Sequence, residues 1–406
     1  MHFLLILGFI IGFIMAMAIG ANDAANSMAT AVGAKAITPK QAIFIAGILE
    51  FVGATFFGKQ VTETIRKGIV DPAVLNNVDY VVIGSMGALL AAAIWIFFST
   101  RYGLPVSTTH SIIGGMIGYG IAAGGWKVVN WGKVGTVTMS WILSPVIGLI
   151  FAFALFKLLS LVILHAKDPV KSTKIWAPIF IASAFVIIGF SFAFKVMRLK
   201  SWAQASIYGL GFGIVALIVS VYYVNKVLRD KQGNNEYTRV EEVFRMVQVV
   251  TSSYVALAHG ANDVANAIAP VAAIYAAVQL GDVGAKATIP RYILAIGGLG
   301  IAIGVWLFGR KVMETVGEKL TELTNTRGFV IDFSTATVVL GASNMGLPIS
   351  TTHTVVGSVL GVGFARGIGA VNIGLVLEIV ASWFFTVPAA AFISYILFYV
   401  LKALFI

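Results

Sequence analysis

A succession of long apolar runs, separated by short polar segments, constrains this sequence more than any other feature. Hydrophobic residues fill 59% of the 406 positions, charged residues fill only 11%, and the mean hydropathy is +0.93. Soluble domains carry roughly 25% charged residues, so this composition predicts an all-α polytopic membrane protein. A helix that crosses a bilayer core needs roughly 20 apolar residues. The chain offers about twelve candidate transmembrane segments: 1–32, 41–57, 80–99, 105–122, 134–163, 175–195, 202–226, 246–276, 289–309, 331–345, 349–365 and 371–402.

The composition also excludes several classes of function. The chain contains no cysteine, so it forms no disulfide, no thiolate metal site and no cysteine nucleophile. The formal net charge of +11 does not indicate a nucleic-acid partner, because the lysines and arginines are scattered through short segments between apolar runs. In a membrane protein such residues set the topology. The first run lacks the basic start and cleavage pattern of a signal peptide, so we expect it to be retained as a helix.

A seven-residue motif occurs twice. Residues 20–26 read Gly-Ala-Asn-Asp-Ala-Ala-Asn, and residues 260–266 read Gly-Ala-Asn-Asp-Val-Ala-Asn. An ionisable side chain inside a membrane costs about 3 kcal/mol or more unless it faces protein, water or an ion, so its repetition indicates function. The small residues around each aspartate would let a helix open there. We therefore expect each copy to supply half of one cation site.

A second motif is also duplicated. Residues 103–110 read Gly-Leu-Pro-Val-Ser-Thr-Thr-His, and residues 346–353 differ only in having Ile in place of Val. Gly-Leu-Pro ends the preceding element, and Ser-Thr-Thr favours a helix start, where hydroxyls accept hydrogen bonds from free amides. A helix N-terminus carries about half a positive charge. Two helix starts at membrane depth predict an anion site whose hydroxyls surround a tetrahedral oxyanion. Residues 105–122 are short for a span, so they are expected to form a half-helix or a re-entrant arm.

Both motifs lie within a larger internal repeat. The order of apolar runs predicts a first repeat at 1–164, an inserted membrane hairpin at 165–226, a cytoplasmic linker at 227–245 and a second repeat at 246–406. Five spans in each repeat and two in the hairpin make the repeats inverted, which is typical of secondary transporters. A modest positive-inside bias places the N-terminus outside. The linker is expected to be a solvated loop.

The paired motifs resemble the signature of the inorganic phosphate transporter (PiT) family, whose members cotransport phosphate with a cation. The resemblance covers nearly the whole chain. It implies a symporter that imports inorganic phosphate with sodium by alternating access, in the inner (plasma) membrane and as a homodimer. Sodium would be a co-substrate, and no cofactor is expected. Members of this family use sodium or protons, and some carry metal–phosphate complexes, so those alternatives stay open.

Oxygen chemistry and the resemblance together select the candidate site residues. The predicted phosphate contacts are Ser107, Thr108, Thr109, Ser350, Thr351, Thr352, Asp23 and Asp263. Carboxylate and carboxamide oxygens suit a hard cation such as sodium. The predicted sodium ligands are Asp23, Asn26, Asp263 and Asn266, with Asn22, Asn262, Glu50 and Glu378 as further candidates. His110 and His353 are possible phosphate contacts or proton carriers.

Two of these acidic residues break the repeat. Glu50 aligns with Ile301, and Glu378 aligns with Thr136, so each half carries one carboxylate that the other lacks. A charge kept on one side only, inside an apolar helix, calls for its own explanation. We interpret the pair as a further cation site or as groups that give the transport cycle its direction.

Simpler interpretations exist for each group. The aspartates and glutamates could be hydrogen-bonded structural residues, the hydroxyls could be helix caps, and the histidines could be packing groups. An enzyme is disfavoured because serine, histidine and aspartate occur in symmetric pairs, whereas a catalytic triad needs one residue in each role. An ion channel is the stronger rival, but inverted repeats around one central site favour alternating access.

Overall fold

The computed structural model describes residues 2–70, 75, 77–102, 106–199, 201–230, 235–280, 289–319, 323–367 and 373–406. Described residues before the central hairpin form α1 (His2–Asn22), α2 (Ala24–Gly33), α3 (Pro39–Phe57), α4 (Lys59–Gly68), α6 (Val78–Arg101), α7 (Thr108–Gly124) and α8 (Trp131–Leu159). The hairpin consists of α9 (Pro169–Lys195) and α10 (Trp202–Asp230). The remaining helices are α11 (Glu236–Leu280), α12 (Arg291–Lys319), α13 (Asn325–Asn344), α14 (Thr351–Arg366) and α15 (Ile373–Phe405).

Short polar residues fix where several of these helices begin. The Thr38 hydroxyl accepts a hydrogen bond from Gln41 N, and the Gln41 side chain accepts one from Thr38 N in return, so a capping box starts α3. Asp168 caps α9 by accepting from Lys171 N at 2.8 Å. Both helices have proline at their first position, where the missing N–H would be unpaired in any case.

The all-α membrane fold is confirmed. Among the described residues, nine helical segments are long and apolar enough to cross a membrane. Every one of the twelve predicted apolar runs falls on a helix, and the three runs outside the nine fall on α7, α13 and α14. α7 and α14 have only 17 and 16 residues, in agreement with the expected short helices. A sharp stop precedes α14, because Gly346 adopts a positive φ of 70° that favours glycine.

The sequence predicted that a helix would open at each copy of the first motif, and the structure shows that this prediction was wrong. α11 runs without interruption through residues 260–266. In the first copy only Asp23 interrupts the helix, and its N–H still donates to Ile19 O at 2.9 Å. The backbone has no need to open because neighbouring side chains satisfy the buried carboxylates. The true discontinuities lie at the second motif, where α7 and α14 start.

The loop expected over 226–245 is also largely wrong. α10 continues to Asp230 and α11 begins at Glu236, so the described part of this segment is helical apart from Asn235. Arg239 supports this junction, since its Nη2 donates to Leu228 O at 2.8 Å. The polar residues of this segment therefore belong to the ends of α10 and α11 and do not mark where these helices stop.

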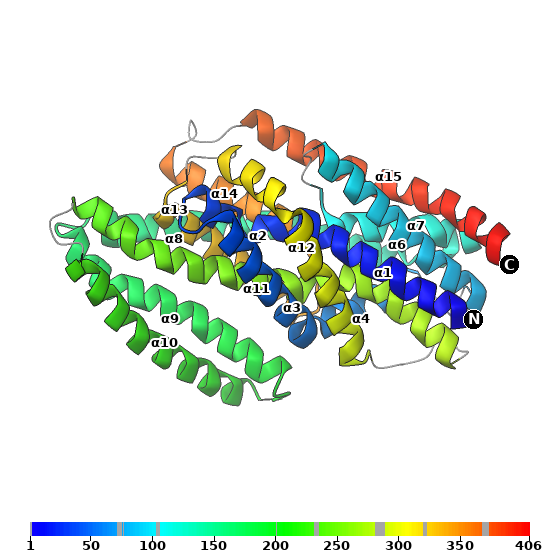
Figure 1. Cartoon of the computed structure of the whole chain (residues 1–406), viewed down its shortest axis with the longest axis horizontal. Coiled ribbons are helices and arrows are strands. Elements are labelled where there is room, and N and C mark those ends of the chain that lie inside the picture. The colour runs from blue at the N-terminus through cyan, green and yellow to red at the C-terminus, as the bar shows by residue number, and fades with distance from the viewer. Residues whose placement is uncertain are drawn as a thin grey trace.

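Helices from the first part of the chain pack against helices from the last part. Figure 1 shows α15 beside α7, and α14 packs against α8 in the same manner. α1 likewise packs against α12, and α11 against α3. Backbones touch at equivalent glycines, since a Cβ at Gly20 would lie 2.1 Å from Ile301 O, and one at Gly260 would lie 2.3 Å from Glu50 O. Only glycine fits at either position, because a Cβ would overlap a backbone carbonyl oxygen of the neighbouring helix.

The α9–α10 hairpin forms one edge of the molecule, in green in Figure 1. One lysine ties it to the remaining helices. Lys195 Nζ donates at 3.0 Å to both Phe57 O and Ser343 O, near the ends of α3 and α13. A cation at two helix C-termini is favourable because both ends carry partial negative charge.

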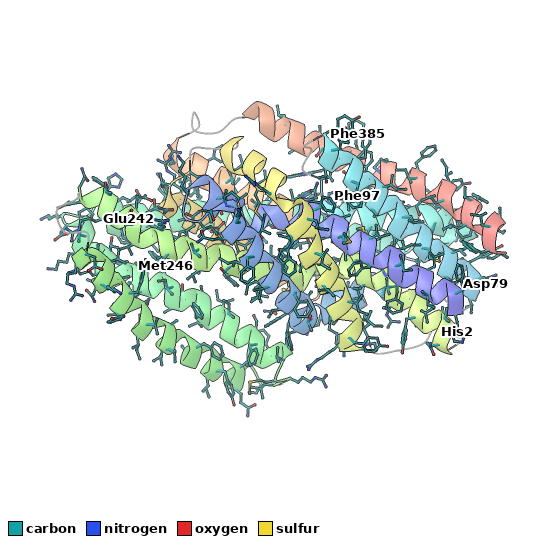
Figure 2. All side chains as sticks on the ribbon, in the orientation of Figure 1. His2, Asp79, Phe97, Glu242, Met246 and Phe385 are labelled. Carbon is teal, nitrogen blue, oxygen red and sulfur yellow. The ribbon has the colours of Figure 1, made fainter. Side chains whose placement is uncertain are left out.

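The outer surface is apolar along its middle. Figure 2 shows Phe97 and Phe385 projecting from the bundle, and their side chains are 37% and 69% exposed. The polar residues labelled in the figure lie towards the ends, with Asp79 and His2 at one end and Glu242 at the other. Such a band is what a lipid-facing surface requires.

Candidate functional site

The buried centre is organised by Asp23, which lies between α1 and α2 and is 2% exposed. Its Oδ2 accepts from Thr108 Oγ1 at 2.7 Å and from Thr108 N at 3.4 Å. Its Oδ1 accepts from Thr352 Oγ1 at 2.8 Å. Thr108 and Thr352 belong to the first turns of α7 and α14, so one carboxylate joins the N-termini of two helices. Both duplicated motifs therefore meet at one point, as predicted.

The six predicted hydroxyls divide into different roles. Ser107 and Ser350 are helix caps, and each accepts from the N–H three residues later at 3.3 Å. Thr109 Oγ1 donates to Ile349 O at 3.1 Å, which links the two helix starts directly. Thr351 Oγ1 is buried and forms no hydrogen bond with the described residues. The capping interpretation thus holds for the serines, while Thr108 and Thr352 contact Asp23.

The second aspartate lies in a buried ion-pair network. Asp263 Oδ2 is 2.6 Å from His259 Nε2, and the other ring nitrogen, Nδ1, is 2.5 Å from Glu50 Oε2. Ser27 Oγ adds a longer hydrogen bond to Glu50 at 3.4 Å. An imidazole with a carboxylate at each nitrogen satisfies both only when it carries two protons. His259 therefore bridges Glu50 and Asp263 through its two ring nitrogens.

Asparagines complete the centre. Asn266 Nδ2 donates at 3.1 Å to the hydroxyls of Thr108 and Thr109, and Asn262 Nδ2 donates to Ile349 O at 2.8 Å. Asn22 Nδ2 donates to Thr100 Oγ1 at 2.6 Å. The described residues supply no hydrogen bond to the amide oxygens of Asn22 and Asn262, although both oxygens are buried. The site therefore offers acceptor oxygens without partners.

Those oxygens, together with the carboxylates, fit a cation. Ligand atoms of Asp23, His259 and Asp263 all lie within 4.8 Å of one another. The carboxyl groups of Asp23, Glu50 and Asp263 lie around one imidazole, so acidic groups outnumber the basic group at the buried centre. A buried charge of this kind is unfavourable unless it is balanced. Hard cations prefer oxygen ligands of the carboxylate and carbonyl type.

Two predicted ligands lie outside the described side chains. The backbones of Asn26 and Glu378 are helical, in α2 and α15, but their side-chain positions are not described. Their proposed roles as cation ligands stay predictions. Glu50, in contrast, is fully buried and belongs to the central network through His259.

The paired histidines of the second motif face away from this network. The His110 ring lies 3.7 Å from the Trp141 ring, the His353 ring lies 3.4 Å from the Trp383 ring, and the two imidazoles are 4.5 Å apart, all between centroids. These four residues line an apolar cavity of about 510 Å³. Stacking against indole favours a packing role for both histidines over contact with an anion.

Sequence reasoning missed two buried residues. His259 precedes the second copy of the first motif directly, and the first copy has Ile19 at the equivalent position, so comparing the copies would have singled it out. Asp332, on α13, accepts from Thr30 Oγ1 at 2.6 Å and from Ser252 Oγ at 2.5 Å. It is an isolated acid in an apolar run, which was the signal available in the sequence.

A bundle of membrane-length helices, with two helix N-termini and a carboxylate cluster at its buried centre, is the architecture of a membrane transporter. The phosphate transporter family profile matches residues 19–394. The chain therefore belongs to the phosphate transporter family.

Individual proteins agree with this assignment. A protein of Pyrococcus furiosus, named as a candidate phosphate permease, is 59% identical over 403 residues, which cover 99% of this chain and 97% of the relative. A similarly named protein of Haemophilus influenzae is 40% identical, with 98% and 96% covered. A solved structure described as the sodium-dependent phosphate transporter is 48% identical, with a TM-score of 0.93, and the match covers 98% of this chain and 99% of that one.

Proposed function

We propose that this protein is a secondary active symporter that imports inorganic phosphate coupled to sodium by alternating access. The observation that carries the proposal is the position of Asp23, whose carboxylate accepts hydrogen bonds from the first turns of both α7 and α14. The site thus already holds one anionic group at two helix N-termini. The sodium-dependent transporter with 48% identity supports the choice of both ions.

Phosphate would replace Asp23 as the acceptor at these helix starts. Thr108 and Thr352 would then donate to phosphate oxygens, and Thr351, whose hydroxyl is buried without a hydrogen bond among described residues, would add another donor. Helix N-termini and hydroxyls suit a tetrahedral oxyanion. Released from the threonines, Asp23 would be free to bind a cation.

Sodium would balance the charge. The centre holds three carboxyl groups against one imidazole before phosphate arrives, and phosphate adds further negative charge. Sodium ions bound by Asp23, Asp263 and the free amide oxygens of Asn22 and Asn262 would offset this excess. Neither ion binds well alone, because each supplies the charge that the other needs, and this mutual dependence is the physical basis of coupling.

The cycle would use two inverted repeats. The packing of α7 against α15 and of α8 against α14 is equivalent, and it supports a pseudo-twofold relation between 1–164 and 246–406. Such repeats can rock around a fixed central site and expose it to each side in turn. A homodimer in the plasma membrane is the assembly that the family resemblance favours.

Labelled phosphate uptake into proteoliposomes tests this proposal. An inward sodium gradient is expected to drive accumulation of phosphate above its external concentration, and a proton gradient imposed in sodium-free buffer is expected to drive none. Arsenate should compete because it has the same shape and charge. Accumulation driven by protons alone would replace sodium with protons as the coupled ion. Downhill flux without accumulation under either gradient would indicate a channel.

A further inference from the structure

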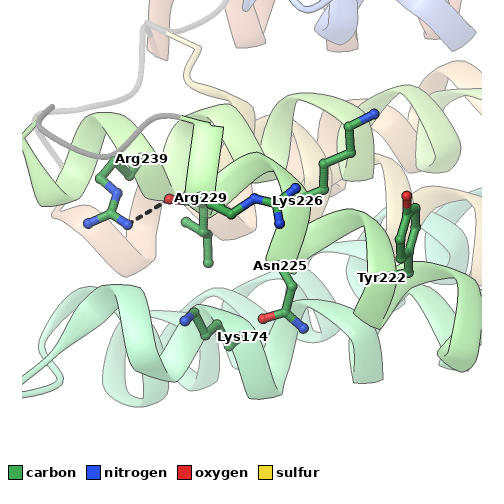
Figure 3. Close-up of a pocket in the computed structure, with 7 residues that line it drawn as sticks. Lys174, Tyr222, Asn225, Lys226, Arg229 and Arg239 are labelled. Atoms are coloured by element: carbon green, nitrogen blue, oxygen red, sulfur yellow. Dashed lines mark hydrogen bonds between the residues drawn. The ribbon is translucent and has the colours of Figure 1, made fainter.

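A basic pocket lies where the α9–α10 hairpin meets the start of α11, far along the bundle from the buried centre. Its volume is about 470 Å³. Side chains from three helices line it, as Figure 3 shows: Lys174 from α9, Tyr222, Asn225, Lys226, Leu228 and Arg229 from α10, and Arg239 from α11. Four of these seven residues are cationic, and none of the described lining residues is acidic.

The cations are only weakly neutralised. Arg229 reaches Asp230 at 3.9 Å, with side-chain exposures of 79% and 56%, and an exposed contact of that length contributes little. Arg239 donates to the Leu228 carbonyl, so it is held in place without losing its charge. Figure 3 shows the Lys174 side chain on α9 and the Asn225 side chain on α10, the two helices of the hairpin. The pocket therefore concentrates positive charge, and the side-chain amide of Asn225 can form hydrogen bonds beside it.

A separate apolar groove lies along the same three helices. Its volume is about 600 Å³, and its lining is almost entirely hydrocarbon. Residues seven and eleven positions apart share one face of a helix. On each helix, groove residues lie seven and eleven positions from a cation of the basic pocket. These are Ile181 and Phe185 for Lys174, Val219 and Val215 for Lys226, and Met246 and Val250 for Arg239.

We propose that the basic pocket binds the phosphate-bearing headgroup of an anionic phospholipid, whose acyl chains lie in the apolar groove. Charge complementarity selects an anionic head, and the shared helix faces place hydrocarbon directly below it. A free anion would need only the pocket and would leave the groove uncovered. The pocket is at the ends of membrane-length helices, where lysine and arginine meet headgroups. The lipid would join α9, α10 and α11 and so hold the hairpin to the other helices.

Native mass spectrometry of the purified full-length protein, after titration with phosphatidylglycerol or phosphatidylcholine, tests this proposal. Phosphatidylglycerol is expected to bind with higher affinity, and the double variant Lys226→Gln/Arg229→Gln is expected to lose about tenfold in that affinity. The matched control is Lys127→Gln/Lys133→Gln, which removes two cations at the start of α8, outside the basic pocket. This variant should bind lipid like the unchanged protein. An unchanged melting temperature of the test variant would exclude misfolding as the cause.

Three outcomes would overturn the proposal. Equal binding of the two lipids would remove the role of charge. Equal affinity in the test and control variants would remove the role of this pocket. Displacement of the lipid by inorganic phosphate at matched concentration would show that the pocket takes a free anion. The purified variants should also transport phosphate when reconstituted in zwitterionic lipid, so a lost lipid site is separable from a damaged centre.

Discussion

Replacing Asp23 with asparagine is expected to reduce sodium-driven phosphate uptake to the level of protein-free liposomes. The amide keeps the size of the carboxylate but removes its charge, so the proposed sodium site loses its central ligand. It also places an N–H2 group against Thr108 or Thr352, both of which now donate to this side chain. Removing one partner of a buried charge pair costs about 3–5 kcal/mol, so losing the carboxylate proposed to bind sodium predicts a loss of roughly a hundredfold or more.

The fold should survive this change. Asp23 is 2% exposed, and an amide of the same size avoids the cost of burying a charge, which offsets the weaker hydrogen bonds that it forms. Thermal unfolding of purified Asp23→Asn should therefore give a melting temperature equal to or above that of the unchanged protein. Asp79→Asn, the same chemical change at an exposed position on α6, is the matched control and should transport normally. Normal sodium-dependent uptake by Asp23→Asn would refute the cation site.

Replacing Thr108 and Thr352 with valine is expected to weaken phosphate binding strongly. Valine keeps the shape of threonine and removes the hydroxyl that each helix start offers to the anion. Each change should cost about 1–3 kcal/mol, which is roughly a 5- to 150-fold weaker affinity, and the double variant should lose more than either single variant. Equilibrium binding of labelled phosphate to the purified variants, at saturating sodium, measures this loss.

Thr173→Val separates this effect from packing. Thr173 is fully buried on α9, and its hydroxyl donates only within its own helix, to Pro169 O at 2.8 Å. The change at this position should leave phosphate affinity unaltered. If the double variant of Thr108 and Thr352 binds phosphate as tightly as the Thr173 variant, the two threonines serve only to hold Asp23 and the helix starts.

Much of the fold followed from hydropathy alone, because in a membrane every backbone group must be paired within helices. The start of α7 and α14 was also predictable, since Ser107 and Ser350 are preferred caps at each break. The expectation that Asp23 and both threonine clusters contact one ion implied that they lie together, and the structure joins Asp23 to Thr108 and Thr352.

The remaining features depend on contacts that sequence patterns do not encode. The prediction of an opened helix at Asp263 was wrong because His259, one turn earlier, satisfies its carboxylate. Glu50 was singled out as an asymmetry, but only the structure shows its partner, which lies 209 residues away on another helix. The length of α11 exceeded the apolar pattern because its first turns are polar.

We propose that one buried centre binds phosphate and sodium together. This claim is tested most directly by measuring the affinity of the purified protein for labelled phosphate in sodium and in choline buffer of equal ionic strength. Phosphate is expected to bind at least tenfold more tightly in sodium, and sodium more tightly by the same factor in phosphate, since binding coupling is reciprocal. Equal phosphate affinity in sodium and choline would contradict the claim.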